Sequence, residues 1–171
     1  MSRRTLLLVF ALFVCLLTGC KKPVIEHKHK YIGIINNSDL ELLADYSLST
    51  KNSFYSTLLI CCNCHLNLPD RVEDQYIAPH SEKKKGIIES SYDSYEIIFE
   101  KNEKISLLLI DCAKIPYVDL DKGAELKSIC FRYDVCLDDL EELGWTVTFP
   151  PTEEMRGITM DPDIDTILQM Y

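Results

Sequence analysis

The chain has 171 residues, of which 47% are apolar, so it is long enough for one domain with one packed core and too apolar for a disordered protein. Its formal charge is −9 at pH 7 and its pI is near 4.9. Because no face rich in lysine and arginine offsets this charge, the chain repels polyanions, and nucleic acid is excluded as an expected partner.

The first nineteen residues predict a lipoprotein signal peptide. Arg3 and Arg4 form a short basic segment, and the apolar run over residues 5–17 that follows is too short to span a hydrocarbon core of ~30 Å. The run ends in the residues Leu-Thr-Gly-Cys at positions 17–20. This ending resembles the lipobox of bacterial lipoproteins, in which the cysteine thiol receives diacylglycerol before cleavage on its N-terminal side.

The lipobox resemblance implies a mature chain of 152 residues that begins at lipidated Cys20. Loss of Arg3 and Arg4 leaves 16 basic residues against 27 acidic ones, a formal charge of −11. Each buried acyl methylene contributes about 0.8 kcal/mol, so the acyl chains on Cys20 make the lipid bilayer the expected partner without any spanning helix. Residues 20–30 are the lipidated cysteine and a polar, basic tether. By resemblance to lipoprotein sorting rules, Lys21 implies the outer membrane.

Residues 31–151 predict a β-rich domain. Apolar residues there alternate or form short solid runs between turn residues, which is typical of strands. The run over residues 107–110 is apolar on both faces and predicts a central strand. Six to eight short strands predict a mainly β fold, an antiparallel β-sandwich of immunoglobulin-like or related type. The expected strands are residues 31–35, 57–66, 75–78, 86–89, 95–100, 105–112, 128–135 and 145–149.

One short helix near the C-terminus is predicted over residues 137–144. Acidic residues occupy its first turn, where the helix dipole favours them, and Gly144 stands at its C-terminal end. A second short helix around residues 40–43 is an alternative for that segment. Residues 101–104 are expected to join the strands 95–100 and 105–112 as a hairpin, and residues 152–171 to form an acidic C-terminal tail.

The segment RYDVCLDDLEELGWTVTFPP, residues 132–151, resembles the C-terminal signature of small uncharacterised lipoproteins of Bacteroidota. Residues 154–160 resemble the tail of those proteins, and residues 33–38 resemble their first strand. Cys136 stands where Ser or Thr would cap the turn, and Gly144 where Asn is usual. The resemblance implies an envelope location and a β-rich domain, and it carries no activity to transfer.

Six cysteines remain once Cys15 leaves with the signal peptide and Cys20 carries lipid. In an oxidising envelope an even number favours disulfides, whereas free buried or half-exposed thiols are the alternative. As strand residues, Cys62 and Cys64 would share the inner face and Cys61 would point away. The candidate disulfide cysteines are Cys61, Cys62, Cys64, Cys112, Cys130 and Cys136.

The sequence Cys61-Cys62-Asn63-Cys64-His65 also permits a thiol redox or zinc-binding protein. A redox dithiol normally lies at a helix N-terminus, and structural zinc draws on a second ligand cluster, which this chain lacks. Neither metal nor cofactor is therefore expected. No nucleophile elbow, zinc-protease, P-loop or dinucleotide motif occurs, so we expect a protein that is not an enzyme.

Three further residue patterns resemble functional sites. Asp161, Asp163 and Asp165 have the spacing of a calcium loop, but Thr166 stands where glycine is required, so a solvated acidic tail is expected. Thr166 also lies in Asp-Thr-Ile, which resembles the short O-glycosylation sequon of Bacteroidota. Trp145 alternates with apolar residues and is expected in the core rather than as a sugar-stacking platform.

Together these patterns predict a membrane-anchored cell-envelope lipoprotein that acts as a non-enzymatic binding or structural accessory. A glycan- or peptide-binding surface module is one alternative, and the thiol or zinc protein is another.

Overall fold

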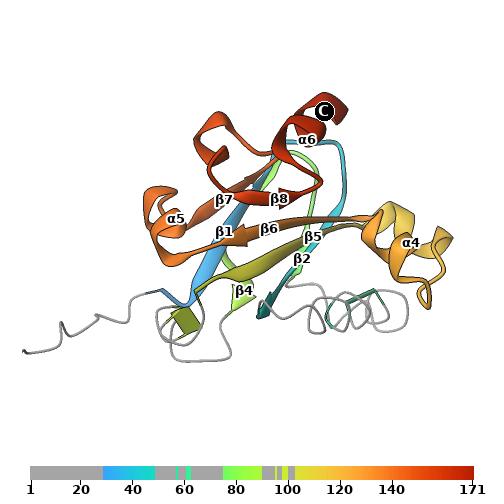
Figure 1. The fold of residues 1–171 in the computed structure, drawn as a ribbon, viewed down its shortest axis with the longest axis horizontal. Helices are drawn as coiled ribbons and strands as arrows, with labels where there is room; N and C mark the ends of the chain where they lie inside the picture. Colours follow the sequence, from blue (N-terminus) through green and yellow to red (C-terminus); the bar gives the residue numbers. More distant parts are fainter. Residues whose placement is uncertain are drawn as a thin grey trace, which may run out of the picture.

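The computed structural model describes residues 29–48, 57, 61–62, 75–89, 95, 98–99 and 103–171. Within these residues the chain is mainly β and forms two sheets that face each other, with short helical segments at the margins (Figure 1). The predicted fold class is thus confirmed.

The smaller sheet has the strand order β4-β1-β7. Its members are β1 (Tyr31–Asn36), β4 (Ser81–Glu89) and β7 (Thr146–Phe149). β1 runs antiparallel to β4 but parallel to β7, so this pair departs from the expected all-antiparallel arrangement. Gly33 permits the close approach of β7, because a Cβ at this position would lie 3.2 Å from the Thr146 hydroxyl oxygen.

The larger sheet is antiparallel throughout and has the order β3-β2-β5-β6-β8. Its members are β3 (Tyr76–Ile77), β2 (Leu42–Leu48), β5 (Ile105–Asp111), β6 (Cys130–Val135) and β8 (Thr159–Asp161). β5 is the central strand of the five, as the apolar run over residues 107–110 predicts.

All seven residues of β5 are buried, because each face of the strand meets a different apolar cluster. Leu107 and Leu109 belong to the inner core, which fills the space between the sheets and includes Ile34 and Phe149 of the smaller sheet. Leu108 and Ile110 belong to the outer core, on the opposite face of the larger sheet. The outer core is closed by the 3-10 helix η3 (Cys112–Tyr117) and by α4 (Gly123–Lys127).

Asn36 joins the two sheets at the turn after β1. Its side chain is fully buried and donates to the Leu40 carbonyl at 2.7 Å and to the Ala78 carbonyl at 3.0 Å. The Asn36 side-chain oxygen Oδ1 accepts from the Ser38 backbone N–H at 3.1 Å and from the Ser38 hydroxyl at 2.7 Å. These bonds satisfy a buried amide that would otherwise destabilise the fold.

Several predicted elements are confirmed near their expected bounds. The strands expected at residues 31–35, 75–78, 105–112, 128–135 and 145–149 appear as β1, β3, β5, β6 and β7, and residues 86–89 form the end of the longer β4. The expected helix is α5 (Leu137–Glu142), where the Asp139 carboxylate accepts from the Cys136 N–H at 2.7 Å.

Two strand predictions are wrong at the residues that the structure describes. Thr57, Cys61 and Cys62 are helical, as are Tyr95, Ile98 and Phe99. The other residues of 57–66 and 95–100 lie outside the described ranges. The expected hairpin is wrong as well, since β5 pairs with β2 and β6. A short apolar run fits the two-residue period of a strand as well as the 3.6-residue period of a helix. Tyr95 and Ile98, both buried, have the i, i+3 spacing of one helix face.

The helix considered at residues 40–43 is also wrong, because β2 begins at Leu42. Residues 152–171 are not a solvated tail. They form the 3-10 helix η4 (Glu153–Met155), β8 and the helix α6 (Ile164–Met170), and Met155 and Ile167 are buried in the inner core. The missed signal is a capped helix start: the Asp163 carboxylate accepts from the Thr166 N–H at 2.9 Å, ahead of apolar residues at i, i+3 spacing.

Because β5 is buried on both faces, we expect Leu109→Ala and Leu108→Ala to destabilise the protein to a similar extent, each by about 2–5 kcal/mol. Urea unfolding measures this, with the exposed Lys84→Ala as the control. A loss for only one of the two leucines would contradict the two-core arrangement.

Asp163→Ala should lower stability by about 0.5–2 kcal/mol, because it removes the cap of α6, whereas Asp163→Asn keeps a capping side chain and should change stability little. Thermal unfolding of both variants checks this. Equal stability of the alanine variant and the parent would contradict the role of Asp163 as the cap of α6.

Candidate functional site

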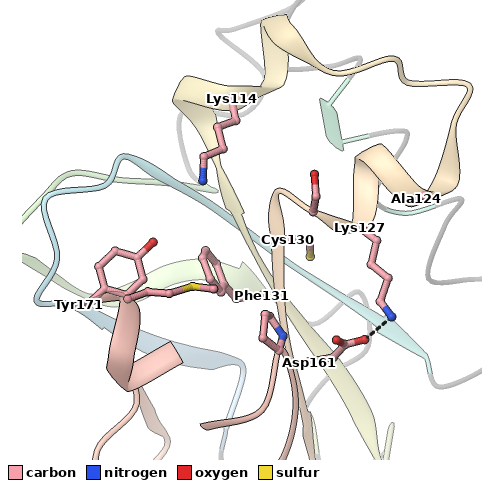
Figure 2. Close-up of a pocket in the computed structure, with 10 residues that line it drawn as sticks. Lys114, Ala124, Lys127, Cys130, Phe131, Asp161 and Tyr171 are labelled. Atoms are coloured by element: carbon pink, nitrogen blue, oxygen red, sulfur yellow. Dashed lines mark ion pairs between the residues drawn. The ribbon is translucent and has the colours of Figure 1, made fainter. Parts of the chain in front are cut away.

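A pocket of about 370 Å³ opens between α4, the start of β6, β8 and α6 (Figure 2). Its lining comes from segments far apart in the sequence, which the pairing of β6 with β8 brings together. This volume falls within the range of small-molecule sites. The lining residues are Lys114, Ala124, Lys127, Ser128, Cys130, Phe131, Asp161, Pro162, Met170 and Tyr171.

One side of the pocket is apolar and partly aromatic. The Phe131 ring is the centre of this side, with its centroid 4.6 Å from that of Phe149 below and 6.1 Å from that of Tyr171 beside it. Met170 and Tyr171 extend this surface outward and are 57% and 49% exposed. Exposed apolar side chains next to a pocket are typical of ligand sites rather than of an ordinary surface.

The other side carries two lysines, each paired with an acid. The Lys127 ammonium lies 2.7 Å from an Asp161 carboxylate oxygen, and that of Lys114 lies 3.0 Å from an oxygen of Asp111. Asp111 is buried and caps η3 by accepting from the Ala113 N–H at 3.2 Å. In Figure 2 the Lys114 side chain descends from η3 toward the space beside Tyr171.

Local chain geometry fixes the segment between the lysines and β6. Ser128 follows α4 and its hydroxyl donates to the Glu125 carbonyl at 2.7 Å, which closes the helix end. The chain then enters β6 at Cys130, with Ile129 buried in the outer core. The Ser128 hydroxyl hydrogen is therefore already used in a bond to the backbone.

Four of the six candidate cysteines lie together in one apolar cluster, the outer core. Cys61, Cys62, Cys112 and Cys130 are buried in the outer core. Cys136 precedes α5, and Cys64 lies outside the described residues. The five described cysteines are free thiols, and the disulfide pairing stays a prediction. The division of Cys61 and Cys62 between two strand faces is wrong, since both are helical and both are buried.

Burial makes these thiols weak acids. It raises the pKa of Cys62 to about 11 and that of Cys112 to about 12, and it raises the pKa of Cys130 as well. The Cys61 thiol donates to an Asp45 carboxylate oxygen at 2.9 Å, and burial raises the pKa of Asp45. A thiolate is the nucleophile in redox exchange, so this arrangement favours inert packing over dithiol chemistry.

The acidic residues with calcium-loop spacing each have a structural partner. Asp161 pairs with Lys127, Asp163 caps α6, and Asp165 accepts from Arg156 at 2.9 Å. Among the residues that the structure describes, no three His, Cys, Asp or Glu side chains are placed to hold a metal ion.

Thr166 lies in the first turn of α6, and its hydroxyl donates to the Asp163 carboxylate at 2.8 Å. A glycan on this oxygen would remove that bond. O-glycosylation of Thr166 stays a prediction.

Trp145 was expected in the core; it is half-buried and packs against the inner core. Its ring stacks on that of His29, with centroids 3.9 Å apart and planes within 9°. The Tyr95 N–H donates to the His29 carbonyl at 2.8 Å. The end of the expected tether therefore packs on the domain, and His29 occupies one face of the indole.

The sequence patterns missed the pocket residues Lys114, Lys127 and Tyr171. No local spacing relates them, because strand pairing and the position of α6 bring them together. The sequence feature that comes nearest to indicating the pocket is Phe131, an aromatic residue at the start of an alternating strand.

Comparisons with protein-family models, with curated proteins and with solved structures find no match for this chain. Across the part of the chain that is described, no helix is long and apolar enough to cross a membrane.

The raised thiol pKa values predict a loss of stability in alkali. The folded-state values of about 11 for Cys62 and about 12 for Cys112 exceed the unfolded value. An unfolded thiol ionises near pH ~8.5, so stability is full below that pH and falls as the pH rises toward the folded-state values.

Cys112→Ala should flatten this fall, which urea titrations between pH 8 and 10.5 measure. Comparison with the parent cancels the effect of lysines and tyrosines, which titrate in the same range. A variant with the same alkaline slope as the parent would contradict the assignment.

Proposed function

We propose that the protein is a cell-envelope lipoprotein in which Cys20 carries the membrane anchor and the folded domain serves as a non-enzymatic binding accessory. The observation that carries this proposal is the ordered pattern at the start of the chain: two arginines, a short apolar run and the lipobox-like ending at Cys20. The anchor accounts for location, and the pocket supplies a binding surface.

The short connection between the anchor and the domain supports this reading. Eight residues, 21–28, separate Cys20 from His29, which stacks on Trp145. Fully extended, this length of chain spans at most roughly 30 Å. A lipid on Cys20 would therefore hold the domain close to the bilayer surface.

The pocket lies at the opposite end of the domain from His29, the described end of the expected tether. β6 begins at Cys130, which lines the pocket, and ends at Val135, next to α5 and the turn that carries Trp145. Figure 1 likewise has α6 and the start of β1 at opposite ends of the domain. With the anchor at Cys20, the pocket would face away from the bilayer, where a ligand can reach it.

The alternative of a glycan- or peptide-binding module concerns the same domain. The His29 stack argues against Trp145 as the sugar platform. The thiol or zinc alternative is disfavoured by the burial of the described cysteines and by their raised pKa values.

Metabolic labelling with an alkyne palmitate analogue tests the anchor. The parent should incorporate the label and sediment with membranes, and Cys20→Ala should lose both properties, because the acyl chains have no other expected attachment site. Cys15→Ala is the matched control, since that cysteine leaves with the signal peptide, and it should label like the parent.

Unchanged labelling of Cys20→Ala would remove the anchor and the envelope role with it. Loss of labelling in Cys15→Ala as well would contradict the expectation that this cysteine leaves with the signal peptide, and the lipobox assignment of Cys20 would then be rejected.

A further inference from the structure

We infer that the pocket beside Lys114 binds a small ligand with a carboxylate and a flat apolar body. This inference names the ligand class for the binding role proposed above, and it rests on the geometry of the pocket rather than on the anchor. The juxtaposition that carries it is a half-exposed lysine across from the ring surface of Phe131 and Tyr171.

The two lysines differ in what they offer to a ligand. Lys127 pairs with Asp161 at 2.7 Å, and both residues line the pocket, so the charge of each is compensated where a ligand would lie. Lys114 lines the pocket, whereas its partner Asp111 does not. The Asp111 side chain is 2% exposed and that of Lys114 is 55% exposed, so the ammonium is the more accessible group of this pair, while the Asp111 charge still acts on the Tyr171 hydroxyl.

An ammonium has three donor hydrogens, and the Asp111 contact leaves room for a second acceptor. Figure 2 shows the Lys114 side chain and the Tyr171 hydroxyl among the groups that line the pocket. A ligand carboxylate in the pocket would accept from the Lys114 ammonium. A single ammonium of this kind suits a monoanion.

The opposite wall selects for an apolar body. Phe131, Met170, Pro162 and the Tyr171 ring form a surface without charge. A ring or short alkyl group placed there would cover side chains that are now partly exposed. The volume of about 370 Å³ accommodates one or two rings.

The polar groups of the pocket argue against a neutral sugar. A sugar needs several free donors and acceptors around its hydroxyls, but the Ser128 proton is given to the Glu125 carbonyl and Asp161 is held by Lys127. An aromatic or aliphatic carboxylate needs one cation and an apolar wall, which is what the pocket provides.

Photoaffinity labelling of the full protein in its membranes tests the inference. The probe is 4-benzoylbenzoate, an aromatic carboxylate, and its neutral analogue is 4-benzoylbenzamide. Irradiation followed by peptide mapping should place the carboxylate on the C-terminal peptide that carries Met170. An excess of 3-phenylpropionate should suppress this labelling, and the amide should label it several-fold less.

Two lysine variants separate the role of charge from a general effect. Lys114→Met should reduce labelling of that peptide roughly threefold to fivefold, the effect expected of a half-exposed ion pair. Lys84→Met removes an ion-paired lysine outside the pocket and should leave labelling unchanged. Lys114→Arg keeps the charge beside buried Asp111 and should retain most of the labelling, which guards against misfolding of the methionine variant.

Equal labelling by acid and amide, labelling spread along the chain, or no competition by 3-phenylpropionate would each overturn the inference. Carbonate extraction of the same membranes reports the anchor separately. Retention in the pellet with dispersed labelling would reject the ligand class alone, and release from the pellet with labelling focused on the Met170 peptide would reject the anchor alone.

Discussion

The fold depends on β5 being buried on both faces. A strand with apolar side chains on both sides cannot lie at a solvent face, so each of its faces must be covered. The smaller sheet covers one face through the inner core, and the segments after β5 cover the other through the outer core. β2 and β6 are thereby fixed as its neighbours, and β6 in turn orders β8 and α6. The pocket is a consequence of this order, since its walls are elements that β6 brings together.

The sequence was sufficient where one pattern had one structural solution. The run Leu107–Ile110, apolar on both faces, predicts a central strand, and the acidic first turn with Gly144 predicts α5. The sequence was insufficient where an apolar segment fits both the strand period and the helix period. Tyr95 and Ile98 fit a strand by their apolar character and a helix by their spacing, and tertiary packing decided for the helix. The acids of residues 161–165 predicted solvent exposure. Asp163 instead caps α6, and Ile164 and Ile167 of that helix are buried.

Of the candidate sites, Cys20 is predicted from the sequence because a lipobox is a local pattern along the chain, and its lipidation stays a prediction. The sequence could not identify the pocket, whose lysines and aromatic residues become neighbours only through strand pairing. The cysteines are the instructive contrast. Their close spacing suggested disulfides or a dithiol, but burial in the outer core makes Cys62 and Cys112 weak acids suited to packing. The surroundings of a cysteine, and not its spacing along the chain, decide whether its thiol can react.

His29, which stacks on Trp145, and the pocket lie toward opposite ends of β6, so in the proposed function the domain presents its ligand site away from an anchor at Cys20. The mass of the intact protein purified from its native membranes tests this most directly. We expect the mass of residues 20–171 plus a diacylglyceryl group, with or without a further acyl chain on the new N-terminus. A mass that retains Met1, or a mature chain without lipid, would contradict the account.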